Sequence, residues 1–88
     1  MESVQKFEIT VADENGIHAR PAGLLVKETQ KLSSEICISC GDKTADGKKL
    51  FALMALGAKY GDILTVSVTG INEKADAAAL YRFMQGTF

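Results

Sequence analysis

The chain has 88 residues, a hydrophobic content of 47% and a formal net charge of −1. This length suffices for one hydrophobic core, so we expect a single domain over residues 1–88. The near-neutral charge gives no electrostatic basis for binding nucleic acid, which needs a strongly basic face. No apolar run could cross a bilayer, and residues 1–6 lack the features of a signal peptide. We therefore expect a cytosolic protein without membrane insertion.

Hydrophobic periodicity and turn residues predict the elements in chain order. Alternation of apolar and polar residues predicts strands over residues 5–12, 35–40, 43–45 and 63–69. Apolar residues at helical spacing predict helices over residues 19–32, 50–56 and 73–85. Pro21 marks the start of the first helix, and Gly57 and Gly86 mark the ends of the other two. Strands with one apolar face, interleaved with helices, predict an α+β fold with an antiparallel sheet and helices on one side.

The apolar stripes of the helices predict which residues enter the core. In the first helix the expected inner residues are Ala22, Leu25, Val26, Thr29 and Leu32. In the last helix they are Ala75, Ala79, Leu80, Phe83 and Met84. Asn72 is the expected N-cap of the last helix, and Asp46 is the nearest residue of capping type to the short one.

The only histidine of the chain, His18, lies where a polar turn over residues 13–16 leads into the first helix. The first N–H groups of a helix have no acceptor within it, and the helix dipole adds about half a positive charge there. Such a place attracts anions and disfavours a protonated imidazole, so we expect a neutral, nucleophilic ring. A phosphoryl group on that ring would face the N–H groups of Ala19 and Arg20 and the Arg20 guanidinium.

His18 and Arg20 are therefore the candidate catalytic residues, and Ala19 and Arg20 are the candidate phosphate-binding residues. On these residues alone a second interpretation stays open. A single histidine near a helix start is often a cap, a surface residue or a hydrogen-bonded core residue.

Cys37 and Cys40 have the C-x-x-C spacing of redox pairs and of half a zinc site. They fall in a predicted strand, where a separation of three residues puts the two side chains on opposite faces. No second Cys/His pair is present to complete a metal shell. We expect neither a metal nor a cofactor.

Residues 16–22 (GIHARPA), followed by residues 48–57 (KKLFALMALG), resemble the HPr family. These are the histidine-containing phosphocarriers of the bacterial phosphoenolpyruvate-dependent sugar phosphotransferase system. The resemblance implies an open-faced β-sandwich in which three helices cover one face of a four-stranded antiparallel sheet. It also implies that the phosphorylated first enzyme of the system transfers a phosphoryl group to Nδ1 of His18. A sugar-specific acceptor component would then receive it, and Arg20 would steady the phosphate.

The same resemblance implies a docking surface beside His18 that involves the short helix. A helix this short cannot bury its whole circumference, so some of its apolar residues must stay near solvent. The expected docking residues are Leu24, Lys49, Leu50, Phe51 and Met54, whereas Leu53 and Leu56 are expected in the core. Many members of the family have a serine at the start of this helix that a regulatory kinase phosphorylates. Here Lys49 stands at that position, so no hydroxyl is available there.

The leading hypothesis is a monomeric phosphocarrier in which His18 accepts, holds and donates a phosphoryl group. Such a protein is a stoichiometric carrier and not an enzyme with its own turnover. The alternative is an HPr-like regulatory module whose docking to enzymes or transcription factors is switched by phosphorylation of His18. A third hypothesis, a small-molecule-binding protein with a structural histidine, needs a pocket that the sequence does not indicate.

Overall fold

The computed structural model describes residues 4–88. Its elements are β1 (Gln5–Thr10), α1 (Ala19–Thr29), β2 (Glu35–Cys40), β3 (Lys43–Asp46), α2 (Leu50–Ala55), β4 (Ile63–Thr69) and α3 (Glu73–Thr87). The predicted order of elements is confirmed. Residues 1–3 lie outside the described residues. They are part of the expected domain and of the N-terminal segment that was expected not to be a signal peptide.

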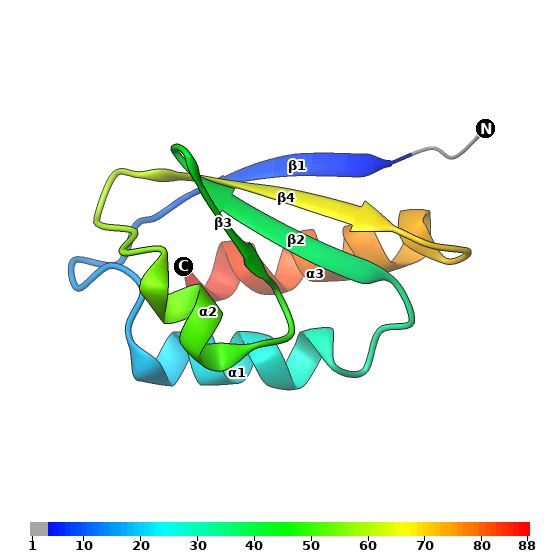
Figure 1. Ribbon diagram of the computed structural model, residues 1–88, viewed down its shortest axis with the longest axis horizontal. Coiled ribbons are helices and arrows are strands. Elements are labelled where there is room, and N and C mark those ends of the chain that lie inside the picture. Colours follow the sequence, from blue (N-terminus) through cyan, green and yellow to red (C-terminus); the bar gives the residue numbers. More distant parts are fainter. Residues whose placement is uncertain (1–3) are drawn as a thin grey trace.

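The strands form one antiparallel sheet with the order β1-β4-β2-β3. The register aligns apolar residues across the two central strands, for example Ile38 opposite Val66 and Ile36 opposite Val68. All three helices lie on one side of this sheet, and the other side is open (Figure 1). The predicted open-faced β-sandwich is therefore confirmed.

The hydrophobic core lies between the covered face of the sheet and the helices. Leu64, Val66 and Val68 of β4 are fully buried, which matches the predicted alternation of that strand. From the helices the core receives Leu25, Leu53, Leu56, Leu80 and Met84. Leu53 and Leu56 thus occupy the core as expected. Within residues 4–88, no helix combines the length and the apolar character needed to span a bilayer.

The end of α1 differs from the prediction, because the helix stops at Thr29 instead of Leu32. Beyond it, Leu32 N–H donates to the Thr29 carbonyl at 3.0 Å, which is the tighter pattern of a 3₁₀ turn. Ala22, Leu25 and Thr29 are buried as predicted, whereas Val26 and Leu32 are only partly buried. The early end lets the chain turn into β2.

The buried face of α3 also differs from the prediction. Ala75 and Ala79 are exposed, and Ala77 takes the inner position instead. The buried positions are Glu73, Ala77, Leu80, Met84 and, just beyond the helix, Phe88. An alanine side chain is small enough for a buried or an exposed position, so the spacing of the alanines does not tell which face of α3 is buried. The helix also continues through Gly86, which was expected to end it, to Thr87.

Two predicted capping residues act elsewhere. Asn72 makes no side-chain cap for α3, and its amide donates to the Ser33 hydroxyl at 3.1 Å. The Asp46 carboxylate accepts the Lys48 N–H at 2.9 Å and so closes the turn before α2, while Lys49 occupies the N-cap without a side-chain bond. Both side chains stabilise connecting segments and not helix ends.

Candidate functional site

His18 is the N-cap residue of α1, as the sequence predicted. Its backbone is extended, with φ −127° and ψ 178°, and its carbonyl accepts the first hydrogen bond of the helix, from the Ala22 N–H at 3.1 Å. The imidazole makes no capping hydrogen bond to the helix. The backbone of His18 is therefore fixed at the helix start, while the ring is left free of a capping role.

The loop before His18 is fixed by close contact with the segment that precedes β4. Gly16 has φ +66°, and a Cβ there would lie 2.4 Å from the Ala58 carbonyl oxygen, so only glycine fits. The next residue, Ile17, donates its N–H to the same carbonyl at 3.0 Å. At the start of the loop, Ala12 N–H donates to the Phe88 carbonyl, which ties the loop to the end of α3.

The His18 side chain is 41% exposed and borders a shallow hollow of about 270 Å³. The residues around this hollow are Asp13, His18, Arg20, Pro21, Leu24, Gly86 and Thr87. The structure thus brings three predicted site residues, His18, Arg20 and Leu24, to one place. The last turn of α3 forms the opposite wall through Gly86 and Thr87, which the sequence near His18 does not predict.

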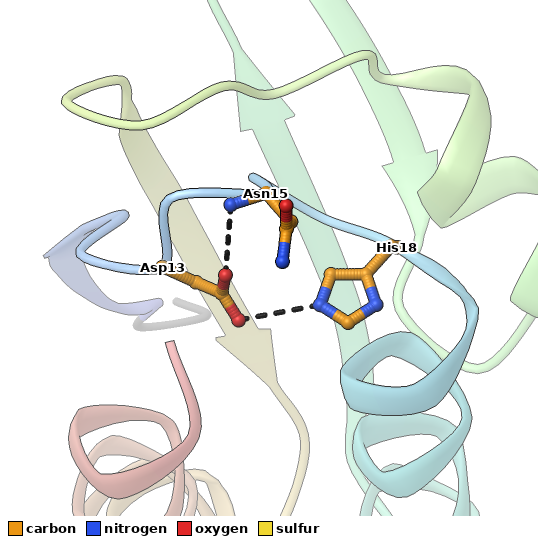
Figure 2. Close-up of polar contacts among 3 residues, drawn as sticks. All are labelled: Asp13, Asn15 and His18. Carbon is orange, nitrogen blue, oxygen red and sulfur yellow. Dashed lines mark hydrogen bonds and ion pairs between the residues drawn. The ribbon is translucent and has the colours of Figure 1, made fainter.

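Asp13 contacts the imidazole, and the sequence did not single it out. Its Oδ2 lies 3.3 Å from His18 Nε2, and its Oδ1 accepts the Asn15 N–H at 2.9 Å (Figure 2). The Asn15 N–H first, and then the contact with His18, lower the pKa of the Asp13 carboxyl from its ordinary value of 3.8. Asp13 is therefore an ionised carboxylate at neutral pH.

A sequence signal for half of this arrangement exists. An aspartate often accepts the N–H two residues on and so forms a turn, and residues 13–16 have that character. The reach of Asp13 to His18, five residues away, depends on how Gly16 directs the chain. The contact between Asp13 and His18 therefore becomes apparent only in the folded loop.

The start of α1 offers donors to an anion. The N–H groups of Ala19 and Arg20 precede the first hydrogen bond within the helix and so have no acceptor there. Arg20 is exposed, and its guanidinium forms no ion pair within the described part of the chain. Figure 2 shows the second ring nitrogen of His18, Nδ1, on the side away from Asp13 and above the first turn of α1.

The predicted docking residues lie on α1, on α2 and, for Lys49, at the N-cap of α2, and the two helices contact each other (Figure 1). Leu24 is 47% exposed and Phe51 is 81% exposed, which is unusual for large apolar side chains. Lys49 is exposed, whereas Leu50 and Met54 are partly buried. The exposed side chains of Leu24 and Phe51 thus lie on the two helices α1 and α2, and His18 is the N-cap of α1.

The two cysteines are free and do not form a site together. Cys37 is exposed on the open face of the sheet, and Cys40 is partly buried on the other. Burial and the nearby Asp62 carboxylate, 3.9 Å from Sγ, raise the pKa of the Cys40 thiol. Among residues 4–88, no three His, Cys, Asp or Glu side chains are grouped to hold a metal ion.

Comparison with known proteins gives consistent similarities over nearly the whole chain. The family described as the PTS HPr component phosphorylation site matches residues 5–86. The phosphocarrier protein HPr of Buchnera aphidicola subsp. Baizongia pistaciae is 43% identical over 77 residues, which cover 88% of this chain and 91% of that protein. A multiphosphoryl transfer protein of Xanthomonas campestris is 38% identical over 78 residues, 89% of this chain and 9% of that protein. The solved structure of a histidine-containing phosphocarrier protein from Mycoplasma superposes with a TM-score of 0.90, at 34% identity and 94% coverage of both chains.

Proposed function

Because the chain belongs to the HPr phosphocarrier family of the phosphotransferase system, we propose that His18 is its phosphoryl-carrying residue and that Nδ1 is the reacting atom. The Nδ1 lone pair attacks the phosphorus of a phosphorylated donor, a new N–P bond forms, and the bond between phosphorus and the donor breaks. In the second transfer an acceptor attacks the same phosphorus, and the electron pair of the N–P bond returns to Nδ1. The donor is the first enzyme of the system and the acceptor is a sugar-specific component.

The observation that carries this proposal is the position of His18 at the open start of α1. Nδ1 is the ring nitrogen that Asp13 does not engage, and it lies above the helix end (Figure 2). The free N–H groups of Ala19 and Arg20 suit a dianionic phosphoryl group, because hydrogen-bond donors and the helix dipole favour negative charge there. The Arg20 guanidinium borders the same hollow and supplies a permanent positive charge.

The accessibility of the site supports a carrier and not an enzyme with its own turnover. Two different macromolecules must reach the same nitrogen, so a deep pocket would hinder transfer. The His18 side chain is 41% exposed, and the hollow beside it is shallow. Nothing at this place encloses a small substrate.

Protein partners would dock on the adjoining surface of α1 and α2. Leu24 borders the hollow, and Phe51 presents an exposed aromatic ring on α2. Apolar anchors of this kind, with charged residues around them, are typical of protein contacts. Arg20 and Lys49 would favour acidic partners, and the partly buried Leu50 and Met54 would add apolar contact area. We further propose that the protein is a single-domain monomer in the cytosol, where phosphoenolpyruvate is available to phosphorylate the donor.

The test is transfer of label from radiolabelled phosphoenolpyruvate through a purified bacterial first enzyme. The protein should acquire a phosphate that is labile in acid and stable in base, and His18→Ala should acquire none. Lys74→Ala, which changes an exposed cation at the start of α3 and outside the proposed docking surface, is the matched control and should be labelled normally. Addition of a sugar-specific acceptor should then remove the label.

Unlabelled wild-type protein would contradict the proposal. Label that appears on His18 but never moves to any acceptor would also contradict a carrier. It would favour the regulatory module, in which phosphorylation only switches docking.

A further inference from the structure

We infer that Asp13 is a positioning residue for the transfer: it holds the His18 ring with its hydrogen on Nε2 and keeps that hydrogen there while Nδ1 carries the phosphoryl group. This inference rests on the proposed function of His18. The observation behind it is the 3.3 Å contact between Asp13 Oδ2 and His18 Nε2 (Figure 2).

The contact determines which ring nitrogen bears the hydrogen. An ionised carboxylate can only accept a hydrogen bond, so the nitrogen that faces it must be the donor. The lowered pKa of Asp13 keeps this carboxyl ionised at neutral pH. A neutral ring with hydrogen on Nε2 has its lone pair on Nδ1, the nitrogen on the side of α1.

Asp13 is itself held in place from two sides. Its Oδ1 accepts the Asn15 N–H at 2.9 Å, and its backbone carbonyl accepts the Gly16 N–H at 2.9 Å. With Oδ1 engaged in the turn, Oδ2 is left for the ring. The carboxylate therefore approaches Nε2 in one orientation, and the turn that carries it is the same turn that delivers His18 to the helix.

This arrangement removes any need for a proton to move during transfer. When Nδ1 forms the N–P bond, the ring becomes positively charged and keeps its hydrogen on Nε2, beside the Asp13 carboxylate. When the phosphoryl group leaves, the electron pair returns to Nδ1 and the neutral ring is restored. A phosphorylated ring that had lost the Nε2 hydrogen would have to leave as an anion, which is a much poorer leaving group. Asp13 thus stabilises the form of the ring that can pass the group on.

The other groups around the ring do not substitute for Asp13. The hollow contains one further charged side chain, Arg20, whose positive charge opposes a positive ring. The end of α3 contributes Gly86 and Thr87, which carry no charge on their side chains. Asp13 is the negatively charged residue that lines this hollow beside the ring.

The sharpest variant is Asp13→Asn. If its Oδ1 keeps the Asn15 N–H, its amide nitrogen faces the ring and can only donate. Nε2 must then accept, and the hydrogen moves to Nδ1. The expected result is inversion of the tautomer, seen in the ¹⁵N chemical shifts of the labelled imidazole. The rate of phosphoryl acceptance should fall about tenfold or more, because the Nδ1 lone pair is no longer available in that tautomer.

Two further variants complete the test. Asp13→Ala should give a mixture of tautomers, because no carboxylate then holds the hydrogen on Nε2. Glu14→Gln is the matched control, because Glu14 is the neighbouring exposed carboxylate. It should leave the ¹⁵N shifts and the transfer rate unchanged.

The two proposals fail in different ways. Unchanged ¹⁵N shifts in both Asp13 variants, with normal labelling of the wild type, would overturn the role of Asp13 alone. A wild type that is never labelled would overturn the proposed function, while the shifts of the unphosphorylated ring would still report whether Asp13 sets the tautomer. If Asp13→Ala does not fold, Asp13→Asn decides, since its amide can preserve the turn.

Discussion

The buried Thr29 hydroxyl donates a 2.7 Å hydrogen bond to the carbonyl oxygen of Gly47, 18 residues away in the sequence. This bond joins the end of α1 to the turn that leads into α2. Gly47 is held from its other side as well, because its N–H donates to the Ile36 carbonyl at 2.7 Å. The buried hydroxyl thus helps to fix the relative position of the two helices that form the proposed docking surface, together with the hydrogen bond from the Gln30 amide to the Lys48 carbonyl at 3.2 Å.

We expect Thr29→Val to lower the free energy of unfolding by about 1–3 kcal/mol, because the Gly47 carbonyl loses its buried donor while the packing volume stays nearly the same. Thr44→Val, at an exposed position of β3, is the control and should change stability by less than about 0.5 kcal/mol. Urea denaturation of both variants measures the difference. Equal stability of the two variants would show that the bond contributes nothing.

Gly16→Ala should destabilise the protein by about 1–3 kcal/mol and slow phosphoryl acceptance, because a Cβ at φ +66° meets the Ala58 carbonyl and displaces the loop that carries His18. Gly23→Ala is the matched control, since nothing lies within 4 Å of a Cβ there and the residue is inside α1. That control should gain about 0.5–1 kcal/mol. Denaturation measures the stability, and the initial rate of labelling measures phosphoryl acceptance. If Gly16→Ala were labelled as fast as the wild type, the position of this loop would not matter for the transfer.

Two neighbouring positions of α2 separate docking from stability. Phe51→Ala should slow transfer to and from partner proteins while changing stability by less than about 0.5 kcal/mol, because the ring is 81% exposed. Leu53→Ala should lower stability by about 2–5 kcal/mol, because that side chain is buried in the core. Transfer kinetics and denaturation of both variants give the comparison. Unimpaired transfer by Phe51→Ala would remove the ring from the docking surface.

Asp13 should make stability depend on pH in the acid range. Its pKa is lower in the folded protein than its ordinary value of 3.8, chiefly through the Asn15 N–H and then through His18. Its contribution is therefore fully present above that value and is lost as the pH falls through the folded pKa. Unfolding of Asp13→Asn should be easier than that of wild type at neutral pH, and the gap should close in acid. A gap that persisted unchanged into strong acid would argue against this carboxylate as the origin.

The two thiols should react at different rates. Cys37 is exposed, whereas burial and Asp62 raise the pKa of Cys40 and so lower its thiolate fraction. Alkylation with iodoacetamide at mildly alkaline pH, followed by mass spectrometry, should modify Cys37 first. Cys37→Ser should remove the fast phase and Cys40→Ser the slow one. Two equal rates in the folded protein would contradict the assignment.

The order of elements, the open-faced sheet and the place of His18 could be predicted from the sequence, because each rests on a local signal. Alternation marked the covered face of β4, and Pro21 with its apolar followers marked the start of α1. Local signals failed where they were ambiguous. The alanine-rich α3 gave a stripe that was wrong at Ala75 and Ala79, because alanine fits a buried or an exposed position equally well.

What could not be predicted depends on segments that are distant in the chain. The contact between Asp13 and His18 needs the loop geometry that Gly16 and Ala58 impose. The wall formed by Gly86 and Thr87 needs α3 to continue past a glycine, and the buried Phe88 holds that end in place. The local sequence around His18 thus signals the turn at Asp13, but neither the contact of Asp13 with the ring nor the wall from α3.

The backbone carbonyl of His18 closes the first turn of α1, so the residue proposed to do the chemistry is also where that helix begins. The Cα of His18 cannot move without unwinding the turn, which leaves only the side-chain torsions for the contact with Asp13 to fix. The helix and the core beneath it therefore fix the backbone from which the reactive ring extends.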